Sequence, residues 1–174
     1  MNLPYPLPAL DLSAPFDRYR ARVVAEWVDP NRHMNMAYYM VAFDKATDVL
    51  FEQLGLSYAY TRHELGMIFV LEAHVTYERE LCEDDPIGIA SRIVDRNQKL
   101  MHVFHRMVHA DKGFAAATCE LLLLHVDFRS RKSAPWPDAC TERIDAMVAA
   151  HRATPDTNRA EHRRGIRPSR PVAA

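Results

Sequence analysis

The sequence has no apolar run that approaches the roughly 20 residues needed to cross a bilayer. It has no charge excess either: its formal net charge is -1, which gives no sign of a nucleic-acid partner. Cysteine is scarce, and its three residues are far apart: Cys82, Cys119 and Cys140. That pattern fits a reducing compartment better than a disulfide framework. The first residues also lack the charged start and apolar stretch of a signal peptide. We therefore expect a cytoplasmic protein that contacts neither membranes nor nucleic acid.

Metal-ligand patterns are missing as well. The chain has nine histidines, but they form no H-E-x-x-H pair and no Cys/His ligand spacing. We therefore expect no metal centre and no other cofactor.

The chain has a length that fits one domain with a proper core. Residues 1–16 are rich in proline and are predicted to form a loose N-terminal arm. Residues 17–152 hold the domain itself. Residues 153–174 form a basic tail with arginines among prolines and almost no apolar residues, so they are predicted to be disordered.

A long apolar helix is predicted over residues 36–54. Its apolar positions cover more than one narrow face, so the helix should be wrapped by other structure. Asn35 or Asn31 is expected to cap its start, and Gly55 to end it. Before it, residues 19–28 read as a strand that Asp29-Pro30 ends.

After Gly66 the pattern changes to β-structure. Four runs, at residues 67–77, 87–94, 100–109 and 114–128, are separated by short turn signals, which imply antiparallel hairpins. Residues 136–152 read as a second helix. The order predicts an α+β fold in which one curved antiparallel sheet of about five strands wraps the long helix.

The stretch from Asp29 to Asn35 places an acid, two amides and an imidazole at the start of that helix. The free amides of a helix start attract negative charge. The oxygen of a thioester or ester becomes negative when its carbonyl carbon is attacked. This corner of the chain therefore indicates an acyl-transfer site.

The same residues resemble a family signature. The pattern D-x-N-x-H-x-N-x-x-x-Y of hotdog-fold thioesterases, the group that includes 4-hydroxybenzoyl-CoA thioesterase, is matched by Asp29, Asn31, His33, Asn35 and Tyr39. Residues 75–77 are similar to its V-x-Y strand, and residues 126–135 to its V-D-x-x-x-R-x-x-P pattern. The resemblance spans about residues 20–138. One departure is Arg32, where the family often has glycine, and a positive φ there would strain an arginine.

The resemblance implies a hotdog fold and the hydrolysis of an acyl-CoA. It also implies a homodimer or homotetramer whose site lies between subunits. The catalytic candidates are Asp29, as general base or as nucleophile, with Asn31 and His33 assisting and Glu72 as a further carboxylate. The substrate-binding candidates are Asn35, Met36, Tyr39, Tyr77 and Arg131. The helix amides at Met36 would hold the oxyanion, and Arg131 the phosphates of coenzyme A.

Two rival functions remain open at this point. An enoyl-CoA hydratase of the same fold carries a D-x-N-P-x-H segment that resembles the motif, and hotdog domains also serve as non-catalytic acyl-CoA-binding modules. The acyl group is open too. Aromatic residues near the motif could accept an aryl group or, by cation–π attraction, a quaternary ammonium. The motif is also similar to thioesterases of bacterial carnitine breakdown, which act on betainyl-CoA.

Overall fold

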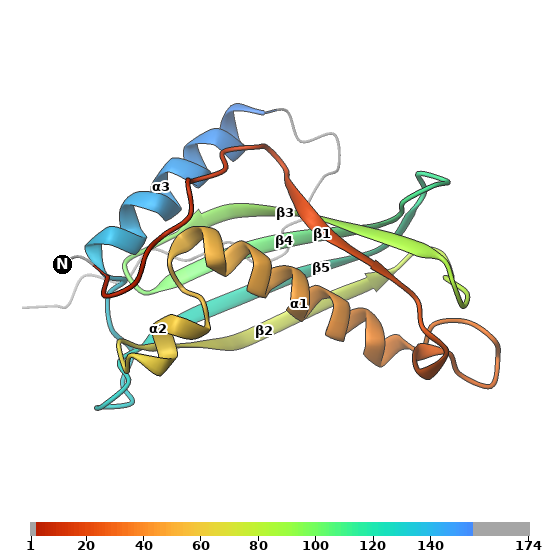
Figure 1. Ribbon diagram of the computed structural model, residues 1–174, viewed down its shortest axis with the longest axis horizontal. Coiled ribbons are helices and arrows are strands. Elements are labelled where there is room, and N and C mark those ends of the chain that lie inside the picture. Colours follow the sequence, from red (N-terminus) through yellow and green to blue (C-terminus); the bar gives the residue numbers. More distant parts are fainter. Residues whose placement is uncertain (1–2, 155–174) are drawn as a thin grey trace, which may run out of the picture.

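A computed structural model describes residues 3–154 of the chain (Figure 1). Its elements, in chain order, are β1 (Phe16–Arg22), the 3-10 helix η1 (Ala25–Trp27), α1 (Met36–Leu54), α2 (Tyr58–Arg62), β2 (Met67–Tyr77), β3 (Pro86–Arg96), β4 (Leu100–His109), β5 (Ala115–Val126) and α3 (Asp138–Ala153).

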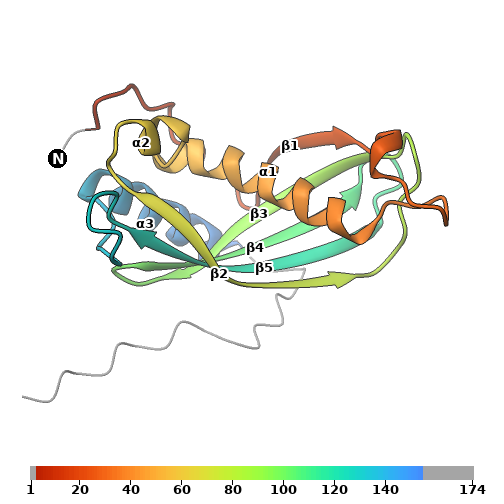
Figure 2. The same cartoon turned by 90° about the horizontal axis from the view of Figure 1, so that it is seen from below.

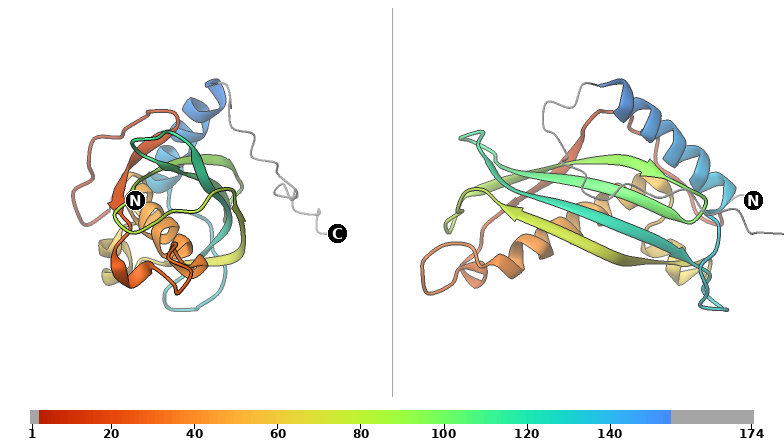
Figure 3. Two further views of the ribbon diagram at one scale, coloured as in Figure 1. Left: turned by 90° about the vertical axis from the view of Figure 1, so that its right-hand side faces the viewer. Right: turned by 180° about the vertical axis from the view of Figure 1, so that it is seen from behind.

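All five strands form one antiparallel sheet in the order β1-β3-β4-β5-β2. The sheet curls around α1, as the view along the molecule shows (Figure 3, left). In Figure 2 the long helix lies along the concave face of the sheet, and α3 packs against β3 and α1. This is the hotdog arrangement, so the predicted α+β fold with its central helix is confirmed.

Helix α1 has the predicted ends, and local chemistry explains both. The side chain of Asn35 accepts a hydrogen bond from the amide of Ala37, and Gly55 adopts the left-handed φ of 76° that ends a helix without strain. The face toward the sheet is buried and includes Tyr39, Phe43, Leu50 and Leu54. The opposite face is open within one chain, where Met36 is 68% exposed. The sheet therefore wraps only one side of the helix.

The first strand differs from the prediction. It runs from Phe16 to Arg22, rather than over residues 19–28, and the chain then turns into η1. Val23 is fully buried, and its backbone bonds to Asp84 and Asp85 of the β2–β3 loop instead of continuing the ladder with β3. Trp27 instead stacks on Tyr38 of α1. The apolar residues that read as a strand therefore serve separate contacts. The remaining strands and α3 match the predicted ranges to within two residues.

The N-terminal arm is anchored rather than loose. The hydroxyl of Tyr5 donates to the carbonyl of Gly55, and Arg143 of α3 donates to the carbonyl of Pro8. Leu3, Tyr5 and Leu10 pack against the core. Apart from Ala153 and Thr154, the predicted basic tail lies outside the described residues. Among the helices that the structure describes, none is long and apolar enough to cross a membrane.

Candidate active site

The motif before α1 forms a closed turn. Val28 and Met34 make an isolated antiparallel bridge, the amide of Asp29 donates to the carbonyl of His33, and the amide of Arg32 donates to the carbonyl of Asp29. Arg32 has a φ of 68°, in the left-handed region that favours glycine. The departure from the family pattern thus falls where a side chain is strained.

The carboxylate of Asp29 is held in place by its own turn. The backbone amide of Asn31 donates to Oδ1 at 2.8 Å, and the side-chain amide donates to Oδ2 at 3.3 Å. The Nδ1 atom of His33 lies 3.7 Å from Oδ1. The side chain of Asp29 is 17% exposed and that of His33 37%. The turn therefore presents a fixed, solvent-accessible carboxylate that can accept a proton or attack a carbonyl carbon.

The start of α1 is anchored beside this carboxylate. Met34 donates its amide to Leu81, and Asn35 donates its amide to Trp27. The amides of Ala37 and Tyr38 are both taken by Asn35, through its side chain and its carbonyl respectively. Among the hydrogen bonds of residues 3–154, none uses the amide of Met36. The helix start therefore keeps one donor at the positive end of its dipole.

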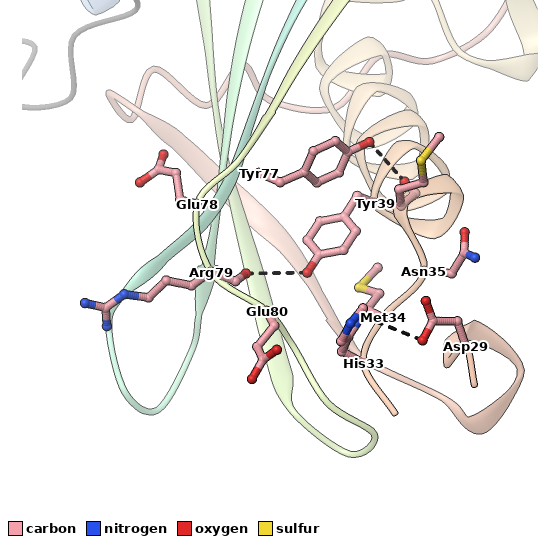
Figure 4. A pocket seen from close by; sticks show the side chains of 10 residues that line it. Asp29, His33, Met34, Asn35, Tyr39, Tyr77, Glu78, Arg79 and Glu80 are labelled. Atoms are coloured by element: carbon pink, nitrogen blue, oxygen red, sulfur yellow. Dashed lines mark hydrogen bonds and ion pairs between the residues drawn. The ribbon is translucent and has the colours of Figure 1, made fainter. Parts of the chain in front are cut away.

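Two tyrosines form the facing wall. Tyr77, at the end of β2, donates from its hydroxyl to the carbonyl of Met36 at 3.3 Å (Figure 4). Its ring meets the ring of Tyr39 edge to face, with centroids 5.2 Å apart. Tyr39 donates to the carbonyl of Arg79 at 3.5 Å, and burial raises the pKa of its phenol. These contacts tie the end of β2 to the first turns of α1.

The space between these elements is a cavity of about 480 Å³. Its lining includes six of the predicted site residues: Asp29, His33, Asn35, Met36, Tyr39 and Tyr77. Asn31 joins the site through Asp29. The lining also includes Met34 and the segment 78–80, which were not predicted as site residues. The sequence could have revealed residues 78–80 as site residues by their position, because they directly follow Tyr77 of the matched V-x-Y segment.

Two predicted residues lie outside this cavity. Glu72 is five positions before Tyr77 on β2, so its side chain points to the opposite face of the sheet. Arg131 follows β5 and lies over the ring of Phe69, with an Nη atom 3.7 Å from the sulfur of Met67. It therefore sits at the other end of β2, roughly 30 Å from Tyr77 along the strand. Within one chain, neither residue reaches the motif turn.

Comparison with known proteins adds independent information. The sequence model of the thioesterase-like superfamily matches residues 23–144. A Pseudomonas aeruginosa protein named betainyl-CoA thioesterase is 33% identical, over 79% of this chain and 86% of its own length. A Ruegeria pomeroyi protein named L-carnitine dehydrogenase/betainyl-CoA thioesterase is 34% identical over 82% of this chain, and the match spans only 28% of that longer protein.

Solved structures agree with these relatives. A Staphylococcus aureus protein solved in complex with CoA is 26% identical, with a TM-score of 0.73, over 76% of this chain and 83% of that chain. A protein of Pseudomonas putida is 28% identical, with a TM-score of 0.74, over 90% of this chain and 99% of that chain.

Proposed function

Because the chain belongs to the thioesterase-like superfamily, we propose that it hydrolyses an acyl-CoA thioester to the free acid and coenzyme A. One observation carries the proposal. The fixed carboxylate of Asp29 and the start of α1 line the same cavity, so a base or nucleophile and an oxyanion donor can act on one carbonyl group. The relatives named thioesterases and the CoA complex of the Staphylococcus aureus protein support this choice of substrate.

The residues suggest how the reaction would proceed. Asp29 either takes a proton from a water molecule that attacks the thioester carbon, or attacks that carbon itself and forms an anhydride that water then cleaves. In both routes the carbon–sulfur bond breaks and coenzyme A leaves as its thiol. Asn31 positions the carboxylate by donating to both of its oxygens. The His33 imidazole would assist proton movement near the attacked carbonyl.

The developing oxyanion would be held at the helix start. The amide of Met36 is the donor best placed for this task, since the amides of Ala37 and Tyr38 are occupied by Asn35. The partial positive charge of the helix N-terminus adds to this single hydrogen bond. In this proposal Asn35 acts as a positioning residue, because its cap sets the direction of the first-turn amides.

The active form is proposed to be a homodimer, which can pair further into a tetramer. Strand β2 lies at the sheet edge, is exposed along most of its length, and carries exposed apolar side chains at Phe69, Val70 and Leu71. A long apolar edge of this kind is a template for pairing with another strand. Antiparallel pairing of two β2 edges buries this surface and opens no new edge.

Such a dimer also explains Arg131. Antiparallel pairing places the Met67 end of one β2 beside the Tyr77 end of the other, so Arg131 of one chain approaches the cavity of its partner. There its guanidinium would bind a phosphate of coenzyme A. Glu72 has no comparable assignment, because its side chain faces away from the tyrosine wall.

The proposed location is the cytoplasm. All three cysteines are free thiols, which supports a reducing compartment. An enzyme that acts on acyl-CoA substrates also does not need to be exported to meet them.

The relatives guide the first substrate to test, which is betainyl-CoA. The experiment is a thiol-release assay with betainyl, short, long and aromatic CoA esters, run beside an assay for crotonyl-CoA hydration. Asp29→Asn should lower kcat by about two to four orders of magnitude while the ester still binds. Asp44→Asn, which changes an exposed carboxylate on the outer side of α1, is the matched control. Near-normal turnover by Asp29→Asn would contradict the assigned role, and failure to release thiol from any ester would contradict the function.

A further inference from the structure

Tyr77 is an exposed aromatic side chain that is nevertheless fixed in place. It is 49% exposed at the cavity. Its hydroxyl is bound to the carbonyl of Met36, and its ring is braced by Tyr39, which is only 4% exposed. A half-exposed ring held from two sides costs little conformational entropy when a ligand packs against it. Its position therefore suits recognition rather than core packing.

The charged residues that line the cavity are mainly acidic. The lining of the cavity has three carboxylates, those of Asp29, Glu78 and Glu80. The guanidinium of Arg79, the one arginine of the lining, lies 5.2 Å from the ring centroid of Phe114 and turns away from the tyrosines (Figure 4). Glu78 also points away in that view. Burial, and to a smaller extent the charge of Glu80, raises the pKa of the Tyr39 phenol. Among the described lining residues, carboxylates thus outnumber the one guanidinium.

This combination suits one class of acyl group. A quaternary ammonium has no N–H and cannot be recognised by hydrogen bonds, but it is attracted to the face of an aromatic ring and to nearby carboxylates. Resting on the hydrolase proposed above, we propose that Tyr77 is the specificity-determining residue for an acyl group that carries a fixed positive charge, and that Glu80 strengthens this preference. A neutral group of the same shape would contact the ring equally but would gain nothing from the ring quadrupole or from Glu80.

The test compares two substrates that differ in one atom. Betainyl-CoA and tert-butylacetyl-CoA have the same shape, but the quaternary nitrogen of the first is a carbon in the second. Both need the same chemistry at Asp29, so the ratio of their kcat/KM values measures recognition of the charge. The wild-type ratio should favour betainyl-CoA, and Tyr77→Leu should lower that ratio about two- to thirtyfold. The loss should appear as a higher KM for betainyl-CoA, because the ring binds ground state and transition state alike.

Matched variants separate the ring from its surroundings. Tyr77→Phe keeps the ring and should keep the ratio. Glu80→Gln should lower it by a smaller factor than Tyr77→Leu. Tyr58→Leu and Glu142→Gln change exposed residues on α2 and α3. They should leave kcat/KM unchanged for both substrates. Because Tyr77 is half exposed, Tyr77→Leu should fold normally, and circular dichroism checks this.

Each outcome supports or overturns the proposal. A wild-type ratio near one overturns it, as does a Tyr77→Leu variant that keeps the wild-type preference. If the protein hydrolyses other CoA esters but neither member of this pair, the assignment of a cationic acyl group is wrong while the hydrolase function stands. If it releases thiol from no ester, the proposed function itself fails.

Discussion

The Nδ1 atom of His33 lies 3.7 Å from Oδ1 of Asp29, across a turn whose ends are joined by the Asp29 amide and the His33 carbonyl. The distance exceeds that of a hydrogen bond, so the imidazole does not hold the carboxylate in its orientation. Asn31, at 2.8 Å, does that instead. The two oxygens of Asp29 are thus positioned by backbone and amide donors, and His33 stays available to a substrate or water molecule.

This arrangement predicts unequal effects of substitutions in the motif. His33→Ala should lower kcat by less than the roughly two to four orders of magnitude expected for Asp29→Asn. The reason is that the imidazole assists a proton transfer that the carboxylate carries out. Steady-state kinetics on one validated ester measures both. His63→Ala, which changes an exposed histidine at the end of α2, is the control. Equal losses at His33 and Asp29 would show that the imidazole is as necessary as the carboxylate.

Arg32 predicts a stabilising substitution. Its φ of 68° costs a non-glycine residue about 1–2 kcal/mol, and the residue is exposed. Arg32→Gly should therefore raise the free energy of unfolding by about 1 kcal/mol, after the greater freedom of glycine in the unfolded chain is subtracted. Urea denaturation measures the change. Arg129→Gly, at an exposed position outside the left-handed region, should instead destabilise the protein. A destabilised Arg32→Gly would mean that the arginine makes a compensating contact.

The helix cap links stability to activity. Asn35→Ala removes the acceptor for the Ala37 amide, so it should lower the free energy of unfolding by about 1 kcal/mol. It should also lower kcat, because the first turn then frays where the oxyanion binds. Asn35→Ser restores a capping oxygen and should recover most of both properties. A variant that loses stability but keeps full kcat would show that the amides of this turn do not contact the reacting oxygen.

The features that sequence predicted well are those with local causes. The start and end of α1 follow from Asn35 and Gly55, whose side chain and φ act within a few residues. The turn signals between the later strands are equally local. The strain at Arg32 was also predictable, since the family places glycine there. The site residues of the motif came together because one turn holds them all.

The features that sequence missed depend on distant contacts. The first strand ends early because Val23 bonds to the β2–β3 loop, which no window around residue 23 reveals. Glu78 and Glu80 line the cavity because β2 ends against the start of α1. The distance of Arg131 from the motif follows from the length and position of β2, and only an assembly could bring the two together.

The buried histidine His105 predicts how stability depends on pH. Its Nε2 lies 3.0 Å from the hydroxyl oxygen of Thr47, and its Nδ1 lies 2.8 Å from the hydroxyl of Ser91. The Thr47 hydroxyl donates its own proton to the carbonyl of Phe43, so it can only accept from the imidazole. The imidazole is therefore satisfied as the neutral Nε2–H form. Burial lowers its pKa to about 3, against 6.5 in the unfolded chain. Between these values the unfolded state binds the extra proton, so stability falls as the pH drops below about 6.5.

The size of that effect can be isolated with one variant. By pH 5, His105 should have removed about 2 kcal/mol from the free energy of unfolding. His105→Gln is less stable near neutral pH, but it lacks this titration, so its deficit relative to the wild type should shrink by that amount at pH 5. Urea denaturation at the two pH values gives both numbers. A constant deficit for His105→Gln would show that His105 is protonated in the folded protein at pH 5.

The proposed β2 dimer predicts that an active site contains residues of two chains. In a mixed dimer of one Asp29→Asn chain and one Arg131→Glu chain, antiparallel pairing gathers both changes in one site and leaves the other site wild-type. Such a dimer, purified with two different tags, should therefore recover activity that neither parent shows. The mirror control is a wild-type chain paired with the Asp29→Asn, Arg131→Glu double variant, in which each site carries one change. This control should remain impaired. If Arg131 acted within its own chain, the outcomes would reverse, because the control would keep one intact site and the first mixture would have none.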